Sequence, residues 1–185
     1  MQQLILKFAP LFLIATPLLA HAEFAVKSVR VQVAPNQLVL NSNLDLSINQ
    51  EIENALNKGI TFSLAIECTL YRKRPIIWDK RIQHWRFQMN MRYHALSGRY
   101  IVGGDAQQSS QSFPSAEAAL QFMGDSKILH LPLSRIKYTK LDDKYILAFR
   151  ARLDIESLPA PLRPIAYTST EWRLSTPWTQ WTLQN

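Results

Sequence analysis

The sequence predicts a mainly β (α+β) protein, a single antiparallel β-sandwich-like domain with two short helices. Apolar and polar residues alternate through several segments between Val26 and Leu153, and a period of two residues is typical of a half-buried strand. A helical period replaces this alternation in two short segments. Residues 23–185 contain no linker long enough to separate two domains, so we expect one domain with one core.

The first 22 residues predict export. Lys7 precedes an apolar stretch, and the small residues Ala20 and Ala22 stand two apart, as signal peptidase requires. We therefore expect residues 1–22 to be a signal peptide that is cleaved after Ala22, and residues 23–185 to be periplasmic. The apolar stretch is too short and proline-broken for a membrane anchor, and we expect no membrane span after cleavage.

The first half of the domain alternates strands with one helix. Alternation predicts strands at 26–33 and 38–48. Ser47 and Gln50 fit a capping box, in which each side chain satisfies an exposed backbone N–H. We therefore expect a helix that is capped by Ser47 and ended by Gly59, where a left-handed residue is favoured.

The strand expected at 60–71 has the most regular pattern. Its even-numbered residues, from Ile60 to Leu70, are apolar, and Cys68 is one of them. A reactive thiol needs exposure and a nearby base, whereas a cysteine on an apolar face is typical of a small buried side chain. Because it is the only cysteine in the chain, it can form no intramolecular disulfide.

A long strand follows the basic turn at 72–75. Its apolar residues are even-numbered at Trp78 and Ile82 but odd-numbered from Trp85 onward. One extra residue near 83–84 would reconcile the two phases, and such an extra residue is a β-bulge.

Turn and cap residues predict where the next elements begin and end. Gly98 suits the left-handed position of a hairpin turn, and the polar stretch 103–112 predicts a flexible loop or a weak edge strand. A short helix follows, with Ser115 as its N-cap and Gly124 as its stop. Pro132 then places a short strand at a sheet edge, because proline cannot donate to a ladder.

The last alternating strand is expected at 145–155, with Arg150 and Arg152 on its outer face. Asp154 and Glu156 look like solvated charges or helix N-terminal residues. Three prolines at 157–164 predict a stiff surface connector, since each fixes its own φ and removes a donor.

Three tryptophans, Trp172, Trp178 and Trp181, fall within ten residues near the C-terminus. Each can bury on the order of 200 Å², which is more than a chain usually leaves in water. We therefore expect an aromatic core that closes the sheet. A ligand platform is the alternative, because exposed aromatic clusters usually bind something.

The sequence offers few groups for catalysis or metal binding. His84, His94 and His130 stand on separate elements, without zinc-ligand spacing, and neither a nucleophile elbow nor a phosphate loop occurs. A Ser–His–Asp set such as Ser110, His94 and Asp105 has no local support. We expect no catalytic residue, no metal and no cofactor.

Basic residues are the candidates for interaction. The chain carries 21 Lys and Arg against 14 Asp and Glu, a net charge of +7. In an exported protein this charge favours lipid phosphates, cell-wall acids or an acidic protein face as partners, and not nucleic acid, although charge also serves solubility. If the arginine-bearing strands share a sheet, they form a basic outer face that suits phosphate or carboxylate; an ordinary solvated face is the alternative. The candidate interaction residues are Arg72, Lys73, Arg74, Trp78, Arg86, Arg92, Arg150 and Arg152.

Five stretches of the chain resemble one known family. They are "LNSNLDLSINQEIENALNKGITF", "LYRKRPIIWDKRI", "RYHALSGRYIV", "QSFPSAEAALQFMG" and "RLDIESLPAPLRPIAYTSTEWRLSTPWTQW". The chain resembles an exported proteobacterial family catalogued as domain of unknown function 4390, whose members are also labelled proline-rich signal peptide proteins. Family members usually have more tryptophan where this chain has Ile76 and Ile77. The resemblance implies no activity, and because the family's genes often lie beside a membrane sensor kinase, it implies a periplasmic accessory to envelope sensing.

We therefore expect a non-enzymatic periplasmic interaction module that binds an envelope protein or an anionic envelope component. The alternative is a carrier of an apolar or glycan ligand, held between the sheets or on the terminal tryptophans. A hydrolase is the third hypothesis. A filled core favours the first, whereas an aromatic-lined pocket of roughly several hundred Å³ favours the second.

Overall fold

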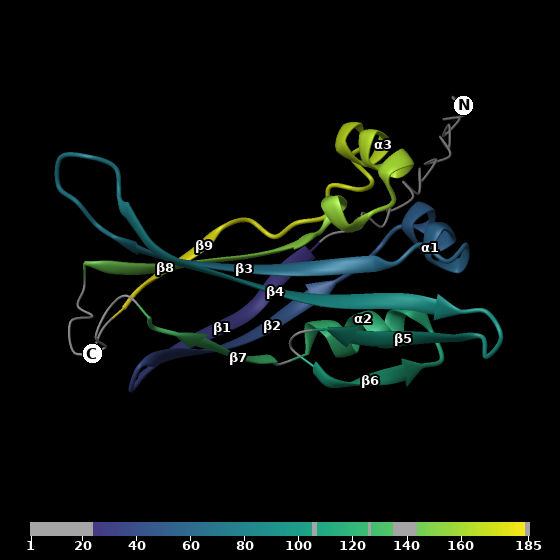
Figure 1. Cartoon of the computed structure of the whole chain (residues 1–185), viewed down its shortest axis with the longest axis horizontal. Coiled ribbons are helices and arrows are strands. Elements are labelled where there is room, and N and C mark those ends of the chain that lie inside the picture. Colours follow the sequence, from purple (N-terminus) through teal and green to yellow (C-terminus); the bar gives the residue numbers. More distant parts are fainter. Residues whose placement is uncertain (1–23, 105–106, 126, 135–143, 184–185) are drawn as a thin grey trace, which may run out of the picture.

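The computed structural model describes residues 24–104, 107–125, 127–134 and 144–183 of the chain. The expected signal peptide, residues 1–22, lies outside the described residues. Within the described part, two antiparallel sheets and three α-helices form a two-layer, sandwich-like arrangement (Figure 1). This arrangement confirms the predicted mainly β fold class.

The larger sheet has six strands in the order β6-β5-β4-β3-β8-β9, and the smaller sheet has three in the order β1-β2-β7. The predicted edge positions are confirmed, since the strands that contain Pro132 and most of 103–112 both lie at sheet edges. The strands are β1 (Phe24–Ala34), β2 (Gln37–Leu46), β3 (Phe62–Arg72), β4 (Lys80–His94), β5 (Arg99–Gly104), β6 (Gln107–Phe113), β7 (Lys127–Pro132), β8 (Tyr145–Leu153) and β9 (Thr179–Thr182).

The first helix, α1 (Gln50–Asn57), begins later than the capping box predicts. Asn49 is the N-cap, and its side-chain oxygen accepts a hydrogen bond from the Ile52 N–H at 2.9 Å. Asparagine caps a helix as well as serine does, and this start places two acidic residues in the first turn, where the helix dipole favours them. The cap predicted at Ser47 is therefore wrong, whereas Gly59, with φ of 90° just after the helix, is confirmed as its end.

The second helix, α2 (Ala116–Gly124), has the predicted N-cap, because the Ser115 hydroxyl accepts from the Ala118 N–H at 3.1 Å. Gly124 has a different role from the predicted one. It is the last helical residue, and a Cβ on it would lie 2.4 Å from the Leu44 carbonyl oxygen on β2. Glycine is needed there so that the helix can approach the small sheet closely.

The proline-rich connector expected at 157–164 is a helical segment. Two 3₁₀ turns, Ile155–Ser157 and Ala160–Leu162, lead into a third helix, α3 (Arg163–Thr168). Pro164 lies in the first turn of α3, where a missing N–H costs no hydrogen bond. The prediction of two helices is therefore one helix short. None of the described helices is both long and apolar enough to cross a bilayer.

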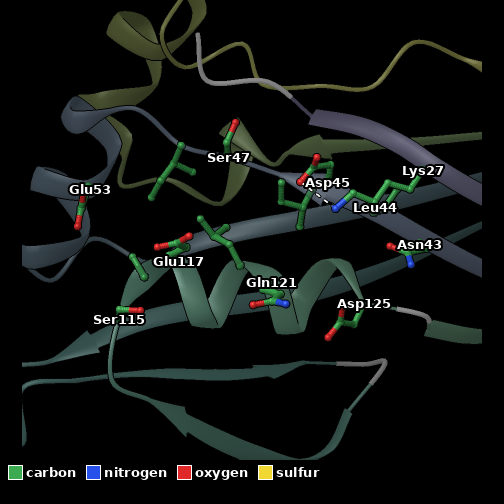
Figure 2. A pocket seen from close by; sticks show the side chains of 14 residues that line it. Lys27, Asn43, Leu44, Asp45, Ser47, Glu53, Ser115, Glu117, Gln121 and Asp125 are labelled. Atoms are coloured by element: carbon green, nitrogen blue, oxygen red, sulfur yellow. Dashed lines mark ion pairs between the residues drawn. The ribbon is translucent and has the colours of Figure 1, made fainter. Parts of the chain in front are cut away.

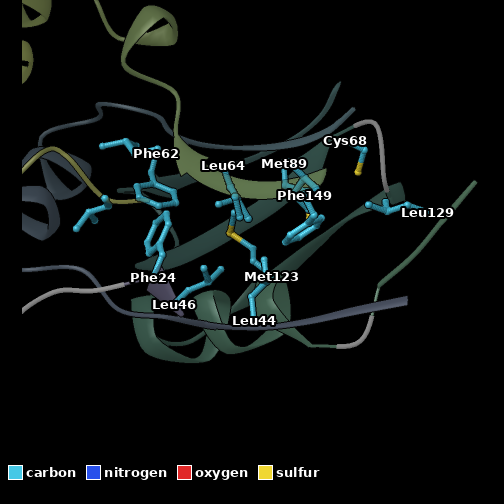
Figure 3. Packing of buried hydrophobic residues seen from close by; sticks show 14 of the residues in the cluster. Phe24, Leu44, Leu46, Phe62, Leu64, Cys68, Met89, Met123, Leu129 and Phe149 are labelled. Carbon is cyan, nitrogen blue, oxygen red and sulfur yellow. The ribbon is translucent and has the colours of Figure 1, made fainter. Parts of the chain in front are cut away.

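The core lies between the large sheet and a layer made by β1, β2 and α2 (Figure 3). Phe24 of β1 meets Phe62 of β3 edge to face, with ring centroids 6.3 Å apart. The predicted even-numbered apolar face of β3 is confirmed, and Cys68 is fully buried on it. The predicted bulge is present one residue earlier, because Leu70 pairs with Gln83 while Tyr71 pairs with Arg81.

Candidate functional site

The connection between β3 and β4 projects from one end of the molecule (Figure 1). Every residue from 72 to 81 is exposed. At its end, Ile76 is 92% exposed, Ile77 56% and Trp78 91%. Three large apolar side chains in a row gain free energy when they are covered, and an exposed apolar patch of this kind marks a contact surface.

Basic side chains stand directly behind these apolar residues. Residues 72–81 contain five basic residues against one acidic residue, and Lys144 joins them from the start of β8, where its carbonyl accepts the Lys73 N–H at 2.7 Å. A hollow of about 450 Å³ lies among them. Its lining is Arg72, Lys73, Arg74, Pro75, Lys80 and Lys144. We call residues 72–81 together with Lys144 the hairpin tip.

The backbone holds these like charges close to one another. Arg72 is paired with Lys80 across the β3–β4 ladder, and like charges on opposing strand positions are destabilising. The Arg72 guanidinium lies 5.9 Å from the centroid of the Tyr145 ring, a cation–π contact, and the Arg74 N–H donates to the Asp79 carboxylate at 3.3 Å. Among the described residues of the hairpin tip, six basic side chains stand against one acidic side chain, and this excess favours an anionic partner. Asp142 and Asp143, which precede Lys144 in the chain, lie outside the described residues.

The arginines predicted on strand faces do share one sheet, because β4 and β8 flank β3. They do not form an open basic field. Arg150 and Arg152 form ion pairs with Glu67 at 3.0 and 2.9 Å, and Arg86 pairs with Asp154 at 2.6 Å. Two carboxylates, one from β3 and one after β8, therefore neutralise much of this face. We call these five residues the ion-pair cluster.

Burial by itself would raise the pKa of the Glu67 carboxyl. Hydrogen bonds from Arg152 and Arg150, together with their positive charges, outweigh burial and hold that pKa below its ordinary value of 4.5. Asp154 is 2% exposed and accepts from the Gln88 amide at 2.7 Å. The predicted solvated environment is therefore wrong for Asp154, because its side chain lies over β4. The alternative, a place at a helix N-terminus, is confirmed, since Asp154 is the N-cap residue of the 3₁₀ turn Ile155–Ser157. Arg92 stands farther along β4, exposed and apart from the cluster.

The three C-terminal tryptophans have different environments. Trp172 is 5% exposed, as the predicted aromatic core requires, and its indole N–H donates to Glu51 at 2.6 Å. Trp181 is partly buried, with its ring 6.3 Å from that of Phe149. Trp178 contradicts the prediction, since it is 44% exposed and lies on the outer face, where Arg150 sits 4.6 Å from its ring centroid.

The residues considered for catalysis are not brought together. His94 makes a 2.9 Å hydrogen bond with Ser97 in an exposed turn. Ser110 lies beside Gly103, which pairs with β4 four residues before His94, a separation of about 13 Å along a strand. Asp105, the third member of the set, lies outside the described residues.

The remaining candidate ligand groups are either buried or hydrogen-bonded to a neighbouring side chain. Burial, with a smaller contribution from the charge of Glu67, raises the pKa of the Cys68 thiol to about 12, so the thiol stays protonated. His84 contacts the Thr69 hydroxyl at 2.9 Å, and His130 the Gln37 amide at 3.3 Å. Within the described ranges, no three His, Cys, Asp or Glu side chains are grouped to hold a metal ion.

A groove of about 750 Å³ lies between α2 and the end of β2 (Figure 2). Among the described residues, four acidic side chains and one basic side chain line it. The basic residue, Lys27, pairs with Asp45 at 3.3 Å. The groove is thus opposite in sign to the chain as a whole. The sequence did not predict it, because its acidic residues, Asp45, Glu53, Glu117 and Asp125, come from three separate segments.

The carrier hypothesis, in the form that places the ligand between the sheets, requires an internal pocket, and the cavity beneath α1 is small. Between α1 and the sheet, a cavity lined by Ile52, Phe62 and their neighbours holds about 10 Å³, which is one water at most. A more apolar groove of about 390 Å³ lies outside the core, beside α1 and Leu162, with Trp172 at its wall. Neither space is an aromatic-lined pocket between the two sheets.

The sequence identified part of the hairpin tip and missed the rest. It predicted Arg72, Lys73, Arg74 and Trp78 as contact residues. Lys80 could have been added, because a hairpin places it opposite Arg72. Lys144 could not, since its position follows from the pairing of β8 with β3, which are more than 70 residues apart in the chain.

A comparison with protein-family models matches residues 21–182 to a model described as Domain of unknown function (DUF4390). Comparison with curated proteins found no match. Comparison with solved structures found none either.

Proposed function

Because the chain belongs to the DUF4390 family, whose description assigns no activity, we propose its function from its surface. It is a non-enzymatic interaction module of the periplasm, and its hairpin tip binds an anionic component or protein of the cell envelope. The observation that carries this proposal is the combination of three exposed apolar residues with a dense basic surround on one projecting hairpin.

The hairpin tip is positioned for binding by a rigid base. The central strand β3 is paired on both sides, with β4 and with β8, and both ladders continue to Arg72. The tip therefore begins where two ladders end. The base of the tip is therefore already ordered before contact, and ordering it costs no further conformational entropy on binding.

The tip also contributes little to the core. Ile76 and Trp78 are almost fully exposed, so the fold gains almost nothing from their hydrophobic surface. A surface that keeps such residues without a stability benefit fits a binding role. Because these residues are not part of the core, variants of the tip should fold normally, and the binding role can therefore be tested by mutation.

The family resemblance supports an envelope partner, and the accessory of a membrane sensor kinase is one form of the proposal. The filled core lends no support to the carrier hypothesis, because the space beneath α1 holds about 10 Å³. The ion-pair cluster is largely self-neutralised, which makes it a weaker candidate than the hairpin tip for an anionic partner.

In-cell photo-crosslinking tests the proposal. A photoreactive amino acid is placed at position 78 or 73, and at position 96 as a matched control, since Leu96 is 96% exposed on the hairpin at the other end of β4. We expect adducts, identified by mass spectrometry, that form from 78 and 73 but not from 96. Identical adducts from all three positions, or bulk envelope proteins alone, would contradict the proposal.

A further inference from the structure

We propose that the hairpin tip binds the surface of an anionic lipid bilayer, inserting its apolar end between the headgroups. This inference rests on the proposed function and names the chemistry of its partner. Three features carry it: the apolar end, the basic residues at a fixed depth behind it, and the distribution of charge along the molecule.

The apolar end has the composition of an interfacial anchor. Ile76, Ile77 and Trp78 are consecutive and exposed, and tryptophan is enriched at membrane–water interfaces because its ring is apolar with one polar N–H. Interfacial segments bury their apolar face about 5–10 Å into the boundary of headgroups and acyl chains. A three-residue end is long enough for that depth and too short to span the bilayer.

The basic residues stand at the depth of the headgroups. Arg72 and Lys80 are paired on the ladder, and each is four residues along the chain from Ile76, a span of at most about 14 Å. When the end is buried in the boundary region, these side chains reach the lipid phosphates. Each basic residue near an anionic surface strengthens binding by about fivefold.

The shape of the tip favours a lipid surface over a protein. Contact residues that dominate protein interfaces pair with pockets and complementary residues across the interface. Here the apolar residues are exposed on a hairpin that projects from the molecule (Figure 1). Among the described residues, the hollow behind them is lined by basic residues and Pro75. A fluid surface can close around such a wedge without a preformed pocket.

The acidic groove favours one orientation of the molecule on the bilayer. The acidic groove is lined by residues of α1, α2 and the end of β2, and α1 lies at the end of the molecule opposite to the hairpin tip (Figures 1 and 2). An anionic surface attracts the tip and repels the groove. The contrast in charge between the hairpin tip and the acidic groove thus favours an orientation with Trp78 toward the bilayer.

Vesicle binding by the purified protein tests the inference. Flotation is measured with vesicles of phosphatidylglycerol and phosphatidylcholine in equal parts, and with vesicles of phosphatidylcholine alone. We expect binding to the anionic vesicles, weakened by salt. R72Q/K73Q should weaken it about 25-fold, and W78S about tenfold. The matched controls are R30Q/K58Q, which removes two charges from other exposed positions, and L96S; both should bind as the wild type does.

An environment-sensitive dye on Ile77→Cys reports insertion. Cys68 is fully buried and its thiol stays protonated, so the dye attaches to position 77 alone. We expect a blue shift and a rise in emission on anionic vesicles. Equal binding to neutral vesicles, no binding to either kind, an unshifted dye, or an equal loss in R30Q/K58Q would each overturn the lipid assignment.

The crosslinking experiment separates this inference from the proposed function. Failed vesicle binding together with a discrete protein adduct specific to position 78 overturns the lipid partner and keeps the docking role. Failure of both measurements overturns both. An oligomer in vesicle-free solution that R72Q/K73Q dissociates would place the tip on a second copy, and would also overturn the lipid assignment.

Discussion

Replacing Glu67 by glutamine should destabilise the fold, because this carboxylate is the negative centre of the ion-pair cluster. Its two oxygens accept three hydrogen bonds, one from Arg150 at 3.0 Å and two from Arg152 at 3.0 and 2.9 Å. Glu67→Gln keeps the shape of the side chain. It removes the negative charge that the Arg150 and Arg152 guanidinium groups share, and their side chains are only 29% and 23% exposed. Arg152 keeps only its longer ion pair with Asp154, at 3.8 Å.

The expected cost follows from this geometry. Removing one partner of a buried ion pair costs about 3–5 kcal/mol, and the partial exposure of the arginines lowers this to about 2–3 kcal/mol. For a domain of this size, that corresponds to a decrease in Tm of about 5–10 °C. The matched control is Asp45→Asn, which breaks the exposed pair with Lys27 and should cost less than about 1 kcal/mol.

Urea denaturation at several pH values provides the assay. The pKa of Glu67 is lowered in the folded state, so near pH 4 the unfolded chain binds more protons and stability rises with pH. The stabilisation by Glu67 is complete above the ordinary carboxyl pKa of about 4.5 and is lost as the pH falls through the lower folded value. The difference between wild type and Glu67→Gln should therefore shrink below pH 4.5.

Two results would refute this reasoning. One is a Glu67→Gln variant within about 0.5 kcal/mol of wild type at pH 7, the range of ordinary surface substitutions. The other is an equal cost in an Arg152→Met background, where most of the hydrogen bonds to Glu67 are already absent and the cost should be smaller.

Three further predictions concern packing, the thiol and the hairpin tip. Gly124→Ala should lower the free energy of unfolding by about 1–3 kcal/mol, because the added Cβ would lie 2.4 Å from the Leu44 carbonyl; an unchanged urea midpoint would contradict the close approach of α2. Cys68 should react with a thiol reagent only as fast as the protein unfolds, and rapid labelling of native protein would show that the thiol is accessible. Trp78→Ser should leave Tm within about 2 °C of wild type, whereas a larger decrease would give Trp78 a structural role.

The alternation in β3 predicted its inner face but not its outer one. Ser63 and Glu67, on the polar side, are 3% and 8% exposed. Their burial depends on long side chains from β4 and β8, which lie beside β3 only in the folded sheet. An alternation of apolar and polar residues normally indicates a strand with one buried face. The pattern of a single strand therefore cannot show that other side chains cover its polar face as well.

The errors at α1 and α3 have local causes. Ser47 and Asn49 are both good caps. The Asn49 amide also donates to the Glu171 carbonyl at 3.0 Å, a contact with a distant segment that the capping motif cannot show. Pro164 reads as a breaker in sequence, yet proline is favoured in the first turn of a helix. The terminal tryptophans also could not be placed from sequence, because Trp178 lies on the outer face against Arg150 of β8, a contact that exists only in the folded sheet.

The most direct test of the proposed function replaces residues 73–79, the outer part of the hairpin tip, while keeping the fold. Arg72 and Lys80 are a ladder pair, so an Asn-Gly turn can replace residues 73–79 in the geometry of a two-residue hairpin. The measurement is the fraction of the protein that stays with washed cell envelopes, compared with wild type at equal Tm. We predict that wild type is retained and the tip-replaced protein is released. Equal retention of the two proteins would contradict the claim that the hairpin tip is the contact surface.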